Sequence, residues 1–318
     1  MRTTLNPTLD VVFKMLFGAP ACKEALIALL TAVLKPSVPI RDVRVLNPEL
    51  DLKAVGERGV VLDLLVELVD GRRIDVEMQT TRRPGFRRRV MFYWARAFGR
   101  QLLRGQQYTD LRPVVSIVFL DYRELPTERF HSMFRVMETT ERYVFTDAFE
   151  LHLIELPKRP RSGIPQCEAD LVAWTRFLGA NSDEEVKEAC MTNPDVAKAN
   201  EVLAMLSATP DARELARTRE LALDTYVIEM TEAKKEGRAE GLAEGRAAGV
   251  EEGRAAGVAE GRAEGRLGEL RAAIGALAEV LGIDLGDQKR AELDRLNVDG
   301  LVELRERLRR ERRWPLMP

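Results

Sequence analysis

The first 160 residues alternate between two hydrophobic patterns. Apolar residues recur at helical spacing in two segments, NPTLDVVFKMLFG (6–18), where Thr8 is the expected N-cap, and CKEALIALLTAVL (22–34). Four runs have the composition of strands: VVLDLLVELV (60–69), RRIDVEMQ (72–79), VVSIVFLD (114–121) and LHLIEL (151–156). Between the second and third runs, residues 86–105 have a helical pattern that ends at Gly105. This order of elements predicts an α/β arrangement.

The rest of the chain has helical patterns of three kinds. Residues 168–235 predict helices, with Pro194 in a first turn. A glycine then recurs every fourth residue, eight in all from Gly237 to Gly265, and an amphipathic pattern follows. We therefore expect four regions, which are a core (1–160), a helical region (161–235), a glycine-repeat helix or linker (236–266) and a small helical segment (267–318).

Composition narrows the classes of function. The chain has 318 residues and a net charge of −2, so any contact with nucleic acid must come from a local basic patch. Its three cysteines show no CxxC spacing and it has two histidines, which argues against a disulfide framework or a cysteine or histidine metal cluster. The longest apolar run has about 10 residues, too short for a bilayer. We expect a cytoplasmic protein with no membrane partner.

A carboxylate pair is predicted on the hairpin formed by the first two strands. Asp63 lies in a nearly continuous apolar run, where a buried carboxylate needs a partner. With a two-residue loop, Asp63 would face Met78 across the hairpin. With a three-residue loop (69–71), it would face Glu77, and Gly71 suits the left-handed position that such a loop requires. The alternative is that Asp63 is a structural residue at a strand end.

In the second register, Asp63, Glu77 and Gln79 share one face, because side chains alternate along a strand. Two carboxylates held together repel each other unless a divalent cation lies between them. Magnesium and manganese prefer such oxygen ligands. This arrangement would suit metal-assisted hydrolysis of phosphodiester bonds.

Asp63 followed by Glu77-x-Gln79 in a strand hairpin resembles the PD-(D/E)XK nuclease core, in the variant with Gln at the lysine position. Over roughly residues 4–158 the chain is similar to the Rpn family of recombination-promoting nucleases, also labelled putative transposases. The stretches that carry this similarity are NPTLDVVFKMLFG, VLNPEL, DVEMQ, FRRRVMFYWARAFGRQLLRGQQYTDLRPVVSIVFLD and LHLIELPK. The resemblance implies a restriction-endonuclease-like α/β core, here with a helical C-terminal extension, and a divalent-metal-dependent DNA endonuclease that promotes recombination.

The resemblance also implies roles for individual residues. Asp63 and Glu77 would be metal ligands for Mg²⁺ or Mn²⁺, and the backbone carbonyl of Met78 would be a third. Gln79 would take the place of the catalytic lysine. A neutral amide can orient water but brings no positive charge. Either an arginine compensates for that charge, or catalysis is slow, or activity is lost.

Asp10, on the first predicted helix, matches the accessory acidic residue that such folds place near the metal. The alternative is a surface ion pair between Asp10 and Lys14, four residues apart on a solvated helix face.

A block of arginines follows the motif. Residues 82–104 contain eight arginines and no acidic residue, so no acid within the block pairs with them. The block predicts a wall that binds DNA phosphates, and the alternative is a solvated helix face. The candidate DNA-binding residues are Arg82, Arg83, Arg87, Arg88, Arg89, Arg96, Arg100 and Gln101, of which Gln101 would reach the active site as the following helix does in related folds.

The glycine repeat carries a separate prediction. Eight glycines inside a helix destabilise it by about 6–8 kcal/mol relative to alanine. Either the segment is a flexible linker, or a partner helix packs on the glycines. Acidic and basic residues are seldom four apart here, so they would pair better between helices, which favours a homo-oligomer formed through residues 237–265.

Two other functions remain open at this point. A catalytically inactive nuclease fold would act as a DNA-binding or self-associating module. A helical scaffold with vestigial chemistry would bind a protein partner through residues 168–318.

Overall fold

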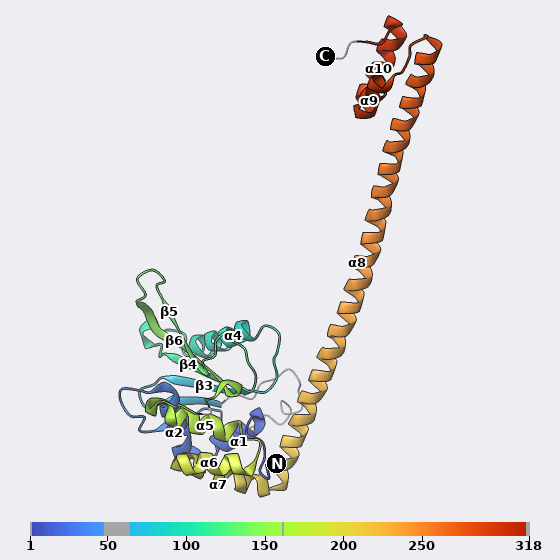
Figure 1. Ribbon diagram of the computed structural model, residues 1–318. Coiled ribbons are helices and arrows are strands. Elements are labelled where there is room, and N and C mark those ends of the chain that lie inside the picture. Colours follow the sequence, from blue (N-terminus) through green and yellow to red (C-terminus); the bar gives the residue numbers. More distant parts are fainter. Residues whose placement is uncertain (1, 48–63, 161, 316–318) are drawn as a thin grey trace. The chain divides into compact units, whose positions relative to one another are not determined.

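The computed structural model describes residues 2–47, 64–160 and 162–315 (Figure 1). The chain divides into two compact units, Met1–Thr231 and Glu232–Pro318. The long helix α8 (Pro210–Val280) begins in the first unit and continues into the second.

The first unit is built on a six-stranded mixed sheet in the order β1-β2-β3-β4-β6-β5. β1, β2 and β3 pair antiparallel, β3, β4 and β6 pair parallel, and β5 returns antiparallel at the edge. The strands are β1 (Val43–Val45), β2 (Leu64–Leu68), β3 (Arg73–Gln79), β4 (Val114–Leu120), β5 (His131–Met137) and β6 (Val144–Glu155). The mixed sheet confirms the predicted α/β class. The sequence reading missed β1, β5 and the first half of β6, where exposed residues obscure any alternation.

Helices cover both faces of this sheet (Figure 1). On one face lie α1 (Asp10–Gly18), α2 (Lys23–Leu34), α5 (Ala169–Leu178), α6 (Asp183–Thr192) and α7 (Pro194–Ala208). The other face is covered by α4 (Phe86–Gly99), whose Phe86 and Val90 pack on Val118, Leu120 and Leu153. Short 3-10 helices are η1 (Pro20–Cys22), η2 (Tyr108–Asp110), η3 (Leu156–Lys158) and η4 (Gln166–Glu168).

Residue 160 is not a boundary between compact units, although the sequence reading placed one there. Helices α5 to α7 share the main hydrophobic core with α1 and α2. Trp174 is fully buried, with its ring 5.8 Å from that of Phe17. The core therefore needs both segments.

Two predicted helix ends are also wrong. α1 begins at Asp10 with Leu9 as its N-cap, because the Thr8 hydroxyl instead donates to Asn6 Oδ1 at 2.9 Å. α4 ends at Gly99 rather than at Gly105, and turns and η2 lie between it and β4.

The β2–β3 hairpin has the three-residue loop. The Leu68 N–H donates to the Arg72 carbonyl at 2.9 Å, and Leu64 lies opposite Val76. Gly71 adopts φ +83°, the left-handed conformation that the loop requires. In this register every second residue of β3 presents its side chain to the face that α4 covers.

The second unit contains the rest of α8, α9 (Asp287–Arg295) and α10 (Val298–Glu311). α8 runs as a helix through the whole glycine repeat. The end of α8 packs on α9 and α10 through a small core that includes Leu270, Ile274, Leu301, Leu304 and Leu308. Within the described ranges no single helix has the length and hydrophobicity to cross a membrane, and α1 with the segment Pro20–Leu34 passes that test only as a pair bent by 80°.

Candidate active site

The face of β3 under α4 is polar and buried. Asp75, Glu77 and Gln79 are 3–5% exposed, while the alternating Ile74, Val76 and Met78 enter the main core. Buried carboxylates and amides are stable only when hydrogen-bonded or paired. This face is therefore either a structural polar layer or a site built for chemistry.

Gln79 links a carboxylate to an arginine. Its Nε2 donates to Glu77 Oε2 at 2.7 Å, and its Oε1 accepts from Arg89 Nη2 at 2.9 Å. The carboxylate only accepts and the guanidinium only donates, so these contacts fix which way the amide points. An arginine thus contacts Gln79 directly, the residue that the resemblance aligns with the catalytic lysine.

Asp10 is held by an arginine from the other end of the unit. Arg219 in α8 is fully buried, and its Nε and Nη2 donate to the two Asp10 carboxylate oxygens at 2.8 and 2.5 Å. Such a bidentate pair is a strong, oriented interaction. The alternative placed Asp10 and Lys14 on a solvated helix face, which is wrong because they are 6% and 5% exposed.

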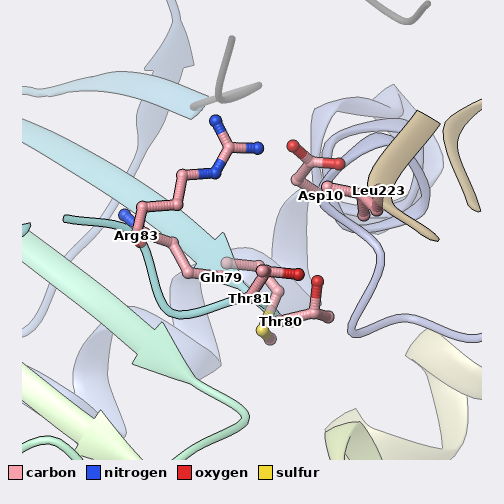
Figure 2. Close-up of a pocket in the computed structure, with 7 residues that line it drawn as sticks. Asp10, Gln79, Thr80, Thr81, Arg83 and Leu223 are labelled. Atoms are coloured by element: carbon pink, nitrogen blue, oxygen red, sulfur yellow. The ribbon is translucent and has the colours of Figure 1, made fainter. Parts of the chain in front are cut away.

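Asp10 and Gln79 border the same small pocket. Its other lining residues are Met78, Thr80, Thr81, Arg83 and Leu223. The carboxylate of Asp10 and the guanidinium of Arg83 point into this space from opposite sides (Figure 2). The helix that carries Asp10 and the end of the strand that carries Glu77 and Gln79 therefore meet at this pocket, and the accessory role of Asp10 stays a prediction.

Arg83 adds a third guanidinium to this region. It is 8% exposed, and its charge lies 5.0 Å from the centre of the Tyr226 ring. Burial lowers the pKa of Arg83, and repulsion from Arg89 and Arg219 lowers it further. Three cations thus lie close to Asp10 or Gln79, and their charge favours anions in this region.

The other predicted arginines divide into two sets. Arg82 and Arg87 pair with Glu124, from the loop after β4, at 3.1 and 3.4 Å. The block is therefore partly neutralised by an acid distant in sequence. Arg88, Arg96 and Arg100 are exposed, and none of them has an acidic partner in the part of the chain that the structure describes.

The prediction for Gln101 is wrong. Its Nε2 donates to the Arg112 carbonyl at 2.9 Å, and its Oε1 accepts from the Arg112 N–H at 3.2 Å. Arg112 lies just before the start of β4, whereas Gln79 lies beside the last residue of β4. Gln101 therefore secures the loop at the opposite end of the sheet.

The candidate donors for a metal are oxygen atoms. The Gln79 carbonyl accepts from the Asp121 N–H on the β4 side, so by strand alternation the Met78 carbonyl points to the opposite, β2 side of β3. A carboxylate and a carbonyl match the preference of Mg²⁺ and Mn²⁺. Asp63 lies outside the described residues, and among those that are described no three His, Cys, Asp or Glu side chains form a metal cluster.

Sequence reasoning missed Arg219. Its neighbours on the buried stripe of α8, Ala212, Ala216 and Leu223, follow helical spacing. A charged residue on an otherwise apolar stripe needs a buried partner, and that was the available signal.

The mixed sheet between two helical layers, with Glu77-x-Gln79 buried on its third strand, defines a restriction-endonuclease-like fold. A family model described as PD-(D/E)XK nuclease family transposase matches residues 7–231, which is more than half of the chain and nearly the whole first unit. The chain belongs to this family. No curated protein and no solved structure matches the chain.

Proposed function

We propose that this protein is a divalent-metal-dependent DNA endonuclease whose cleavage promotes recombination. The observation that carries the proposal is the buried chain of contacts from Glu77 through Gln79 to Arg89, in a chain that belongs to a nuclease family. If the polar face of β3 had only a structural role, apolar side chains would stabilise the fold at least as well. Buried ion networks seldom stabilise a protein more than well-packed hydrophobic residues of similar volume do.

Glu77 and the Met78 carbonyl, together with Asp63, would hold Mg²⁺ or Mn²⁺. The bound ion polarises the phosphate and lowers the pKa of a coordinated water. Gln79 uses one N–H for Glu77 and keeps its second N–H to orient the attacking water or a phosphate oxygen.

Arg89 supplies the positive charge that Gln79 lacks. Its guanidinium lies 2.9 Å from the amide oxygen, close enough to stabilise charge that develops on a phosphate at this position. The exposed arginines of α4 would bind the DNA backbone on either side of the scissile bond.

Supercoiled plasmid and Mg²⁺ test the proposal directly. The full-length protein should nick the plasmid, EDTA should stop the reaction, and Glu77→Gln should slow it by roughly 100-fold or more, as expected when a charged group that binds a catalytic metal is lost. Glu128→Gln is the matched control, because its carboxylate is 85% exposed and it should keep full activity.

Equal nicking by the wild type and Glu77→Gln would show a contaminating nuclease and overturn the proposal. One observation favours the alternative, an inactive DNA-binding module, because Gln79 is neutral where the motif has lysine. An unnicked plasmid that still shifts on a gel would establish that alternative.

We also propose that the protein self-associates through the glycine repeat. In α8 all eight glycines are exposed, and a Cβ atom added at any of them would meet nothing within 4 Å. A second copy of the helix that packs against this strip would offset the low helix propensity of glycine.

Replacing the eight glycines with alanine distinguishes a helix that packs on a second copy from a helix that serves only as a spacer. Each alanine stabilises the single helix by about 1 kcal/mol but fills the close-approach surface. Light scattering should then show a smaller assembly although helicity by circular dichroism rises. An unchanged mass would exclude the glycine contact.

A further inference from the structure

The outer side of α4 carries an aromatic ring among arginines. Arg88, Phe92, Arg96 and the C-cap residue Arg100 follow one another at intervals of four residues, which places them along one ridge of the helix and its C-terminal end. Phe92 is 61% exposed, and the three arginines are exposed. We refer to these four residues as the α4 ridge.

The α4 ridge is not part of the hydrophobic core, and the Phe92 ring contacts only the edge of the neighbouring Tyr93 ring, with ring centres 5.8 Å apart, among the aromatic residues described. The side of α4 that faces the sheet carries Phe86, Val90 and Trp94, whose Nε1 donates to the Val114 carbonyl at 3.0 Å. Arg82 and Arg87 have Glu124 as their acid, whereas the ridge arginines have no acidic partner among the residues described here. An exposed phenylalanine between unpaired cations indicates a ligand that is both anionic and flat-faced.

We propose that the α4 ridge binds single-stranded DNA, with Phe92 stacked on an unpaired base and the flanking arginines on phosphates. The proposal rests on the proposed function, which makes DNA the substrate. Proteins that bind single strands combine a basic track with aromatic rings in this way, because each nucleotide offers both a charge and a π-face. Duplex DNA covers its base faces by internal stacking, so a ring on the ridge would meet only backbone.

The position of the α4 ridge connects it to the active site. Arg88 is the sequence neighbour of Arg89, which donates to Gln79 from the inner side of the same turn. Each step along the ridge rises about 6 Å, so Arg100 lies about 18 Å further along the helix. A strand on the ridge would lead toward Glu77, which implies a substrate with an unpaired segment next to the bond that is cut.

Equilibrium binding in EDTA tests this without any contribution from cleavage. We would measure the fluorescence anisotropy of labelled oligothymidine of about 20 nucleotides and of a duplex of the same length, with the full-length protein. Phe92→Ala should weaken binding of the single strand by roughly tenfold, the loss expected for one stacked base. Phe92→Trp should keep the affinity, and Phe92→Leu should lose it, because leucine is apolar but cannot stack.

Two matched controls lie elsewhere on the first unit. Phe145, on β6, is 74% exposed, and Phe145→Ala should leave binding unchanged. Arg96→Gln should lower the dependence of log affinity on log salt by about 0.7, the value for one phosphate of a single strand. Arg129→Gln should leave the salt dependence unchanged, because Arg129 is exposed but lies outside α4.

Three results would each overturn the proposal. Phe92→Ala could bind the single strand as tightly as the wild type, it could lose affinity for duplex DNA to the same extent, or Phe92→Leu could keep full affinity for the single strand. The last result would indicate an apolar contact without stacking. Plasmid nicking that still depends on Glu77 would leave the nuclease proposal standing, so the failure of one proposal is distinguishable from the failure of the other.

Discussion

Arg88 and Arg89 are adjacent in the sequence, but their side chains lie on different faces of α4. Arg89 points inward, is half-buried and donates to Gln79, whereas Arg88 is exposed without an acidic partner in the described part of the chain. Successive residues of a helix are separated by about 100° around its axis, so a run of like charges is divided between its faces. A block of like charges that folds as a helix therefore contains two groups of residues, one that faces the protein interior and one that faces solvent.

The two populations can be compared as groups. The inner arginines are Arg83, Arg89 and Arg219, and each has a specific partner, respectively the Tyr226 ring, Gln79 and Asp10. The outer arginines are Arg88, Arg96 and Arg100 of the α4 ridge. The inner group is held in place by the fold, so its loss should affect stability or catalysis. The outer group is available to a ligand, so its loss should affect affinity.

The strongest test of the inner group is Arg219→Leu. It takes the guanidinium from the buried Asp10 carboxylate and should lower the free energy of unfolding by about 3–5 kcal/mol, because one half of a buried pair is left. Arg217→Leu, at an exposed position of the same helix, should change it by less than about 0.5 kcal/mol. Urea denaturation followed by circular dichroism measures both, and equal midpoints would contradict the distinction.

The adjacent pair offers the sharpest comparison. Arg89→Gln should lower the cleavage rate at saturating DNA by about 10- to 100-fold, because the charge near the developing oxyanion is lost. Arg88→Gln should keep that rate and weaken binding by a few-fold, with a salt slope lower by about 1 on duplex DNA. Single-turnover cleavage and anisotropy separate the two effects. The same phenotype from both variants would mean that the two faces of α4 do not differ in role.

A smaller effect is expected from the hairpin loop that sets which residues face α4. Gly71→Ala should lower the free energy of unfolding by about 1–2 kcal/mol, because an alanine at φ +83° is strained and its Cβ would lie 3.3 Å from the Arg112 side chain. Gly99→Ala has open space at a helix end and should not destabilise the protein. Equal stability of the two variants, measured by thermal unfolding, would show that the loop tolerates another geometry.

Much of the site's local geometry follows from sequence. The alternation of polar and apolar residues in β3 predicts that Glu77 and Gln79 share a face, and Gly71 makes the three-residue loop favourable, which sets the register. These features depend on strand period and on glycine's backbone freedom, and both act between residues a few positions apart.

The pattern of polar and apolar residues does not predict contacts between distant segments. Glu124 pairs with both Arg82 and Arg87, and Gln101 binds the backbone of Arg112 instead of reaching the site. Neither follows from helical or strand periodicity, because each depends on where a loop places its ends. The exposure of Phe92, next to the half-buried Tyr93 and Trp94, also depends on which side of α4 meets the sheet.

The sequence by itself determined the alternation that makes one side of β3 polar and the acid-free run of arginines, because each is a property of neighbouring residues. Only the tertiary structure decided which arginines are buried and which remain available to a ligand. Asp10 and Arg219 are 209 residues apart, and their pairing exists only because the start of α8 packs beside α1 in the same core. Periodicity carries no information about such a meeting, since it arises from the burial of apolar surface by the whole unit.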